Sequence, residues 1–152
     1  MIRLLTGSTH TGKTLLAQRL LERHGAPYLS IDHLKMGLIR SGMCPLTPES
    51  PDEALTAVLW PVVREIVKTA VENGQSLTVE GCYIPFNWRE DFDASYLPHI
   101  RFLCLVFSEA YIRTRFDAIQ THANAIERRK DDSFCTMELL LAENRRNLEA
   151  CR

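Results

Sequence analysis

One short segment near the start of the chain restricts its possible folds more than any other feature. Gly7, Gly12, Lys13 and Thr14 match the pattern G-x-x-x-x-G-K-[ST], which average composition would produce in roughly 0.5% of chains of this length. An apolar run at residues 2–6 precedes the segment and predicts a buried strand. Apolar residues at helical spacing follow it over residues 13–24 and predict a helix. A strand, a glycine-bounded loop and a helix in this order favour an anion-binding loop.

The residue types in this segment suit a phosphate group. Glycines let the backbone curl, so that successive N–H groups point inward at phosphate oxygens. Lys13 would supply a positive charge for the β- and γ-phosphates, and the Thr14 hydroxyl would bind Mg²⁺. We therefore predict ATP and Mg as cofactors, with Lys13 in a catalytic role; the alternative is a tight glycine turn with a surface lysine. The predicted phosphate-binding residues are Gly7, Ser8, Thr9, His10, Thr11, Gly12, Lys13 and Thr14.

The rest of the chain alternates between strand and helix patterns. Short apolar segments predict further strands at residues 27–31, 76–79 and 102–107. Helical spacing predicts helices at residues 32–40 and 50–73, another that begins at 108, and a last one from about 133. This alternation implies crossover connections and a parallel sheet, so we predict the α/β class with one domain over residues 1–152.

The long helix has a clear start signal in the sequence. Ser50 is the predicted N-cap, Pro51 would occupy the first helical position, and Glu53 would complete a capping box. Pro61 lies inside the same apolar pattern and is predicted to kink the helix, because it lacks one backbone N–H.

Composition excludes several classes of function. The formal net charge is -1, which argues against a general nucleic-acid binder. The five cysteines include no C-x-x-C pair, so neither a zinc site nor a disulfide framework is predicted. The N-terminus has no secretory signal pattern, and the apolar runs are much shorter than the ~20 residues that span a bilayer. We therefore expect a cytoplasmic protein without a membrane partner.

Residues 7–14 and three further stretches resemble the small P-loop kinases of the nucleoside-monophosphate-kinase-like group. This group includes adenylate, shikimate and gluconate kinases, chloramphenicol phosphotransferase and zeta-toxin-like kinases. The further stretches are residues 28–35, 79–85 and 108–130, which look like the segment after the second strand, the third-strand segment and the arginine-bearing lid. The resemblance implies a three-layer P-loop NTPase fold with parallel strands in the order 2-3-1-4. It also implies an acceptor-binding insertion about residues 33–60 and a lid about residues 113–132.

The resemblance assigns a role to two acidic residues. Asp32 would accept the proton of the acceptor; alternatively, it only caps the helix that begins there. Glu80 would help to bind Mg²⁺ at the end of the third strand, or it would form a structural pair, for instance with Lys13 when no nucleotide is bound. Buried carboxylates need such a partner, because burial of an isolated charge is costly.

The resemblance also assigns roles to basic residues. Arg113 and Arg128 would stabilise the transferred phosphoryl group from the lid, although charged runs are commonly solvated faces. Lys35 and Arg40 would hold an anionic acceptor, or they are ordinary solvated cations. The aromatic residues Trp60, Trp88 and Tyr83 either line the acceptor pocket or pack in the core.

The chain departs from the kinase pattern at two places. Pro85 is followed by Phe86, where adenylate kinases have an arginine, so a nucleoside monophosphate acceptor is not supported. No fifth strand is apparent after the lid, so we expect a four-stranded sheet or a fragment of a longer protein. Such a sheet would have an exposed edge or flank, which favours a homodimer.

Together these features predict an ATP-dependent phosphotransferase. Its partners would be ATP and a small-molecule acceptor, most simply one with a hydroxyl group. The alternative is a nucleotide-binding regulatory module or a slow ATPase that has no small-molecule acceptor.

Overall fold

A four-stranded parallel sheet organises the computed structural model, which describes residues 1–122 and 134–151. The strand order is β2-β3-β1-β4, so the predicted order and the α/β class are confirmed. Parallel pairing joins β1 to both β3 and β4, and β2 pairs with β3. The strands are β1 (Ile2–Gly7), β2 (Tyr28–Ser30), β3 (Leu77–Glu80) and β4 (Ile100–Leu105).

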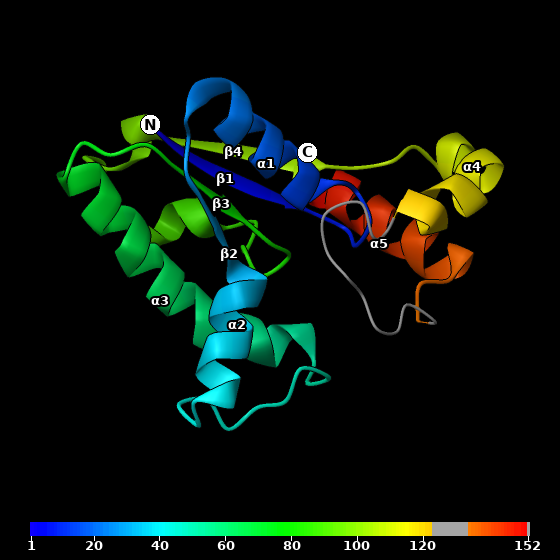
Figure 1. Ribbon diagram of the computed structural model, residues 1–152, viewed down its shortest axis with the longest axis horizontal. Helices are drawn as coiled ribbons and strands as arrows, with labels where there is room; N and C mark the ends of the chain where they lie inside the picture. The colour runs from blue at the N-terminus through cyan, green and yellow to red at the C-terminus, as the bar shows by residue number, and fades with distance from the viewer. Residues whose placement is uncertain (123–133, 152) are drawn as a thin grey trace.

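Helices connect and cover these strands. In Figure 1, α1 lies on one side of the sheet and α3 on the other, and α2 continues from the carboxyl end of β2. The helix α4 lies beyond the carboxyl ends of β1 and β4, whereas the end of α5 reaches back to β4, where Ala150 lines a pocket with Ile100 and Phe102. None of the helices in the described residues is long and apolar enough to cross a lipid bilayer. The helices are α1 (Lys13–His24), α2 (Ile31–Arg40), α3 (Asp52–Glu72), α4 (Glu109–Thr121) and α5 (Met137–Ala150), with short 3-10 helices η1 (Trp88–Asp91) and η2 (Leu97–His99).

The start of α3 differs from the prediction. The helix begins at Asp52 with Pro51 at the N-cap position, and no side chain caps it. The Ser50 hydroxyl instead accepts a hydrogen bond from the Thr47 backbone N–H at 3.0 Å, and Ser50 N–H donates to Thr47 O at 3.0 Å. Ser50 thus closes a turn of its own, a local arrangement that competes with helix capping. Beyond this start, α3 continues through Pro61 as one helix of 21 residues.

Two apolar clusters stabilise the fold. The main cluster joins α3 to the sheet and includes Trp60 and Trp88, which are 6% and 2% exposed, so both tryptophans pack in the core. The Trp60 indole N–H donates to Asp91 Oδ2 at 2.8 Å, which satisfies its polar atom. A smaller cluster around Ile112 and Leu140 joins α4 to α5. The α4–α5 pair therefore has its own small core at the end of the sheet.

A close approach at Gly81 positions α2 over the end of β3. Gly81 follows β3 with φ 156°, and a Cβ placed there would lie 2.9 Å from Ile31 Cβ. Ile31 is fully buried and begins α2. The first turn of α2 can therefore reach the carboxyl edge of the sheet only because residue 81 has no side chain.

Gly81→Ala should lower the free energy of unfolding by about 1–3 kcal/mol, because the added methyl group overpacks against the β-branched Ile31. Gly37→Ala is the matched control, since Gly37 lies inside α2 with no atom within 4 Å of the new Cβ. This control should stabilise the chain by up to about 1 kcal/mol. Urea denaturation of both variants would measure the effects, and equal stability of the Gly81 variant and the natural chain would contradict the close approach.

Candidate functional site

The loop between β1 and α1 has the geometry of an anion-binding loop. Gly7 ends β1 and Lys13 begins α1, so the predicted segment opens a helix as expected. Gly7 has φ 144°, and a Cβ there would lie 2.3 Å from Leu105 O and 2.9 Å from Thr11 Oγ1. His10 and Gly12 also have positive φ, of 63° and 82°. A backbone with this curvature directs N–H groups towards one centre, at the positive end of α1.

The Lys13 ammonium group lies over this loop. Its Nζ donates to Gly7 O at 3.0 Å and to Ser8 O at 2.7 Å. Both acceptors are neutral carbonyls of the loop itself. The positive charge therefore sits where the sequence predicts that phosphate groups bind.

Asp32 lies in the first turn of α2 and does not cap it. The helix begins one residue earlier, and Ser30 is the N-cap residue. The Asp32 carboxylate instead forms an ion pair with Lys35 Nζ at 2.6 Å, and the Asp32 side chain stays 44% exposed. The alternative in which Asp32 is the N-cap residue is therefore wrong, and the carboxylate remains open to a ligand.

Lys35 connects Asp32 to the segment after β3. Its Nζ donates to the Tyr83 hydroxyl at 2.9 Å and lies 5.0 Å from the centre of the Tyr83 ring. The Lys35 side chain is only 12% exposed, and Tyr83 is 4% exposed. Burial raises the pKa of Tyr83 above its ordinary value, with smaller contributions from the charges of Cys82, Asp32 and Asp52. Tyr83 is thus a neutral hydroxyl group that helps to fix the position of Lys35.

Glu80 and Thr14 lie on the two elements that flank the loop. Glu80 ends β3 in register with Leu5 of β1, and it is 1% exposed. Thr14 lies in the first turn of α1. Among the residues that the structure describes, no group of three His, Cys, Asp or Glu could hold a metal ion. A carboxylate and a hydroxyl nevertheless suit Mg²⁺, which usually keeps several waters and takes its other ligands from phosphates.

Of the two predicted lid arginines, one forms an ion pair within α4 and the other lies outside the described residues. Arg113 is on α4, where its Nε and Nη2 donate to Glu109 Oε1 at 2.9 and 2.8 Å, and its side chain is 55% exposed. Arg128 and most of the predicted lid fall within residues 123–133, outside the described residues. Arg40 is the last residue of α2 and is exposed, at the other end of this helix from Asp32. The structure therefore brings Asp32 and Lys35 together but places Arg113 in an ion pair on its own helix.

The sequence did not identify the contacts that α5 makes with the loop. Asn147 Nδ2 donates to Ser8 Oγ at 3.1 Å, and the Thr9 backbone N–H donates to Glu143 Oε2 at 3.3 Å. Asn144 Oδ1 accepts from the Phe107 backbone N–H at 2.7 Å. The sequence does indicate that these polar residues share one helix face, because residues spaced by three or four positions lie on the same side of a helix. That spacing does not identify the partner, which lies 139 residues away in the case of Asn147.

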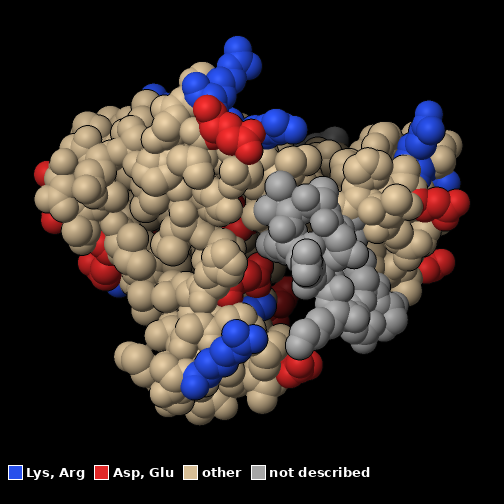
Figure 2. Space-filling view, in the orientation of Figure 1, with Lys and Arg blue, Asp and Glu red and all other residues tan. Residues whose placement is uncertain are grey.

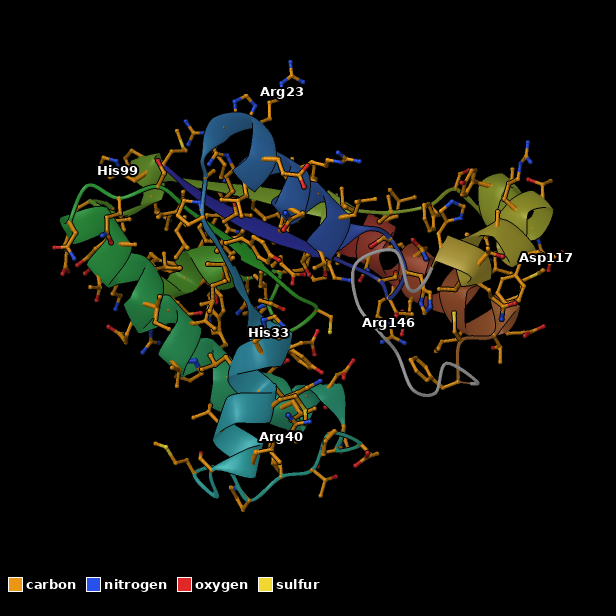
Figure 3. All side chains as sticks on the ribbon, viewed as in Figure 1. Arg23, His33, Arg40, His99, Asp117 and Arg146 are labelled. Carbon is orange, nitrogen blue, oxygen red and sulfur yellow. The ribbon has the colours of Figure 1, made fainter. Side chains whose placement is uncertain are left out.

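The charged groups around the loop share one electrostatic environment. Burial raises the pKa of Glu143; the Thr9 N–H and the charges of Lys13 and Arg146 oppose this shift, whereas Asp52 adds to it. Figure 2 shows acidic and basic side chains gathered in a hollow in the middle of this face, between α2 and the part of the molecule around α5. In Figure 3, Arg146 lies towards this central region, whereas Arg23 and His99 lie at the periphery.

The loop and the start of α2 lie at the same edge of the sheet. Ser30, which precedes α2, is in register with Glu80 of β3, and Glu80 is in register with Leu5 of β1. Because parallel strands end at the same edge, the loop after β1 and Asp32 after β2 belong to the edge where ligands bind in open α/β sheets.

Glu143→Gln should stabilise the chain more at high pH than at low pH. Because burial raises its pKa, Glu143 favours folding below its unfolded-state pKa of about 4.3, and that contribution is lost as the pH rises through the higher folded-state pKa. Gln keeps an oxygen for the Thr9 N–H but cannot ionise. Thermal denaturation between about pH 4 and pH 8 should show the Tm difference between the variant and the natural chain increasing with pH.

Glu149→Gln is a matched control on the same helix, because Glu149 is exposed at the last turn of α5. Its Tm difference from the natural chain should stay small over the same pH range. A Tm difference for Glu143→Gln that decreases as the pH rises would mean that the Glu143 charge stabilises the folded chain.

Comparison with solved structures shows which fold the chain has. No protein-family model and no curated protein matches the chain. Among solved structures, a gluconokinase from Sinorhizobium meliloti 1021 matches with a TM-score of 0.53 and 19% identity, covering 99% of this chain and 74% of that one. A chain of the Pnkp1/Rnl/Hen1 RNA repair complex matches with a TM-score of 0.57 and 13% identity, over 97% of this chain but only 45% of that one.

A third solved structure, from Chloroflexus aurantiacus j-10-fl, is described provisionally as a kinase. It matches with a TM-score of 0.54 and 23% identity, covering 95% of this chain and 78% of that one. At these identities the similarity shows the fold alone. The chain therefore has a P-loop NTPase fold, which it shares with solved structures of kinases.

Proposed function

We propose that the chain is an ATP- and Mg²⁺-dependent phosphotransferase that acts on the hydroxyl group of a small molecule. The observation that carries this proposal is the shared environment of Lys13 and Asp32, because a phosphate-binding loop alone would serve any nucleotide-binding protein. Both residues follow strand ends at one edge of the sheet, since Ser30 is in register with Glu80 and Glu80 is in register with Leu5. A kinase needs such a base or orienting group beside the donor phosphates, whereas a simple nucleotide switch does not.

The donor side would act by positioning and by charge. The N–H groups from Ser8 to Thr14 and the positive end of α1 would hold the β- and γ-phosphates. Lys13 would exchange the carbonyls of Gly7 and Ser8 for phosphate oxygens. Phosphoryl transfer spreads negative charge over the moving group, so a fixed cation lowers its barrier.

The residues at the edge of the sheet suit the metal ion that such a reaction requires. The Thr14 hydroxyl and the Glu80 carboxylate would hold Mg²⁺, with Glu80 acting directly or through water. When bound, Mg²⁺ neutralises charge on the phosphates and orients them. Glu80 would be kept in place by its burial at the end of β3.

The acceptor side would depend on Asp32. Its exposed carboxylate would accept the hydrogen bond of the acceptor hydroxyl and take its proton, as the acceptor oxygen bonds to the γ-phosphorus and the bond from that phosphorus to the departing ADP breaks. Lys35 would hold the carboxylate in position, because it is fixed to Tyr83 by a second contact. We also propose that Arg113 and Arg128 act from the lid, which would require Arg113 to leave Glu109. A cytoplasmic location and a homodimer stay predictions of the sequence.

Lys13→Ala should abolish most of the activity. Loss of one preorganised positive group at the phosphates is expected to lower turnover on the order of 10²–10³-fold, and ATP binding should weaken as well. Lys68→Ala is a suitable control, because Lys68 pairs with Glu65 on α3. Calorimetric ATP binding and ADP formation would be measured for both variants. Unchanged affinity and rate in Lys13→Ala would contradict the proposed function.

Asp32→Asn should separate a kinase from a nucleotide-binding module. The variant keeps the size of the side chain and removes its charge and basicity, so acceptor phosphorylation should fall by ~10²–10⁴-fold. ATP affinity should change little, whereas the Tm should fall modestly, because the mostly buried Lys35 loses its charged partner. Asp117→Asn, on the exposed surface of α4, serves as the control.

Two outcomes would change this interpretation. Full transferase activity in Asp32→Asn would mean that the reaction depends on positioning and phosphate electrostatics alone. ATP turnover that no acceptor accelerates would favour the alternative function, a slow ATPase or a nucleotide-binding regulatory module.

A further inference from the structure

An acidic residue of α5 contacts the loop at a group that would otherwise bind phosphate. Glu143 Oε2 accepts a hydrogen bond from the Thr9 backbone N–H at 3.3 Å, across 134 positions of the sequence. This N–H is one of those that would hold phosphate oxygens in the proposed function. A carboxylate oxygen in this position stands in for a phosphate oxygen, because both are anionic acceptors of the same donor. The loop is therefore already in contact with an anion that the chain itself supplies.

Glu143 has no closer electrostatic partner than the loop. The side chain is partly buried, and burial raises its pKa because loss of water disfavours the charged form. Among the described residues it belongs to no ion pair, since the Lys13 ammonium group donates to Gly7 O and Ser8 O instead. The charges of Lys13 and Arg146 favour the ionised form of Glu143 at longer range. The carboxylate is thus attracted to the same positive environment that would attract a phosphate group.

The helix that carries Glu143 is attached to the sheet by few contacts. It packs mainly against α4, with which it shares a small apolar cluster. Its contacts near the loop are polar: Asn147 Nδ2 donates to Ser8 Oγ at 3.1 Å, and Asn144 Oδ1 accepts from the Phe107 N–H at 2.7 Å. Segments with few buried apolar contacts to the rest of a fold open at a low free energy. A shift of α5 can therefore separate Glu143 from the loop while the main core stays intact.

We propose that the contact between Glu143 and Thr9 is autoinhibitory, because the carboxylate competes with the donor phosphates for the loop and nucleotide must displace it. This inference rests on the part of the proposed function in which the loop binds nucleotide phosphates, and it assigns a means of regulation to that site. Phosphate groups bring several negative charges beside the carboxylate, and like charges repel strongly in a partly buried site. The measured affinity for nucleotide is then lower than the intrinsic affinity of the loop. Any factor that draws α5 away from the loop raises it.

Two substitutions at Glu143 test this competition. Gln keeps an oxygen for the Thr9 N–H but carries no charge, so calorimetry without an acceptor should show that Glu143→Gln binds ATP about tenfold more tightly than the natural chain. A measurement at about pH 8 keeps Glu143 ionised in the natural chain. Glu143→Ala also removes the oxygen, and it should bind ATP at least as tightly as Glu143→Gln. Added salt should reduce the difference between Glu143→Gln and the natural chain.

Two further variants of α5 serve as controls. Glu149→Gln removes an exposed charge from the last turn of the helix, and Asn147→Ala removes a neutral contact with the loop, so neither should tighten ATP binding. An unchanged affinity in both Glu143 variants would overturn the inference, and so would weaker binding, which would mean that the carboxylate assists the nucleotide or its Mg²⁺. An equal gain in Asn147→Ala would overturn the role of the carboxylate and assign the effect to the docking of α5 alone.

The binding measurement separates this inference from the proposed reaction. Because no acceptor is present, a chain that binds ATP but transfers no phosphoryl group would contradict the proposed function and leave the competition at the loop intact. Tighter ATP binding in Glu143→Gln, with unchanged binding in both controls, supports the autoinhibitory contact whether or not an acceptor is found.

Discussion

The contact between Gly7 and the backbone of β4 is the constraint on which the site depends. Gly7 pairs with Leu105 at the end of both strands, and any side chain at position 7 would overlap the Leu105 carbonyl. This approach lets β1 end as a paired strand while the next residues curl into the loop. Lys13 and α1 are placed by that curl, and α4 follows β4 only a few residues after Leu105. The absence of a side chain at Gly7 therefore determines how the sheet, the loop and the helices that follow β1 and β4 are placed.

Local sequence patterns predicted the loop, the strands and most helices because their causes are local. The glycine positions of the loop, and the Ser108 cap that accepts from Tyr111 N–H, follow from residues within a few positions of each other. Strand order came from resemblance rather than from the residues, since pairing between distant strands has no local signal. Ser50 shows that a local pattern can also mislead. Its hydroxyl could cap α3 or accept from the Thr47 N–H, and in the structure it accepts from Thr47.

The docking of α5 could not be predicted for the same physical reason. One face of α5 carries the polar residues Glu143, Asn144 and Asn147. Their role depends on which segment packs against that face, and nothing in the sequence of the helix specifies that segment. The Glu143 carboxylate contacts a loop N–H and lies within the electrostatic range of Lys13. An anion at the loop would therefore meet a negative charge as well as a positive one. Binding of an anion at the loop would therefore oppose the contact between Glu143 and Thr9, whereas the Asn147 contact is between neutral groups and would not be affected by the charge.

The two lysines of the site differ in the partners that hold them, and this difference distinguishes the proposed donor side from the proposed acceptor side. Lys13 is held by carbonyl dipoles, which a phosphate can replace at little cost because charge-assisted hydrogen bonds to an anion are stronger. Lys35 is held by a carboxylate and a buried phenol, and an incoming anion offers it nothing stronger than Asp32 already does. Lys13 is therefore available to a ligand, while Lys35 serves to fix Asp32. Two identical side chains thus acquire different roles, because the fold gives one of them neutral partners and the other a charged partner.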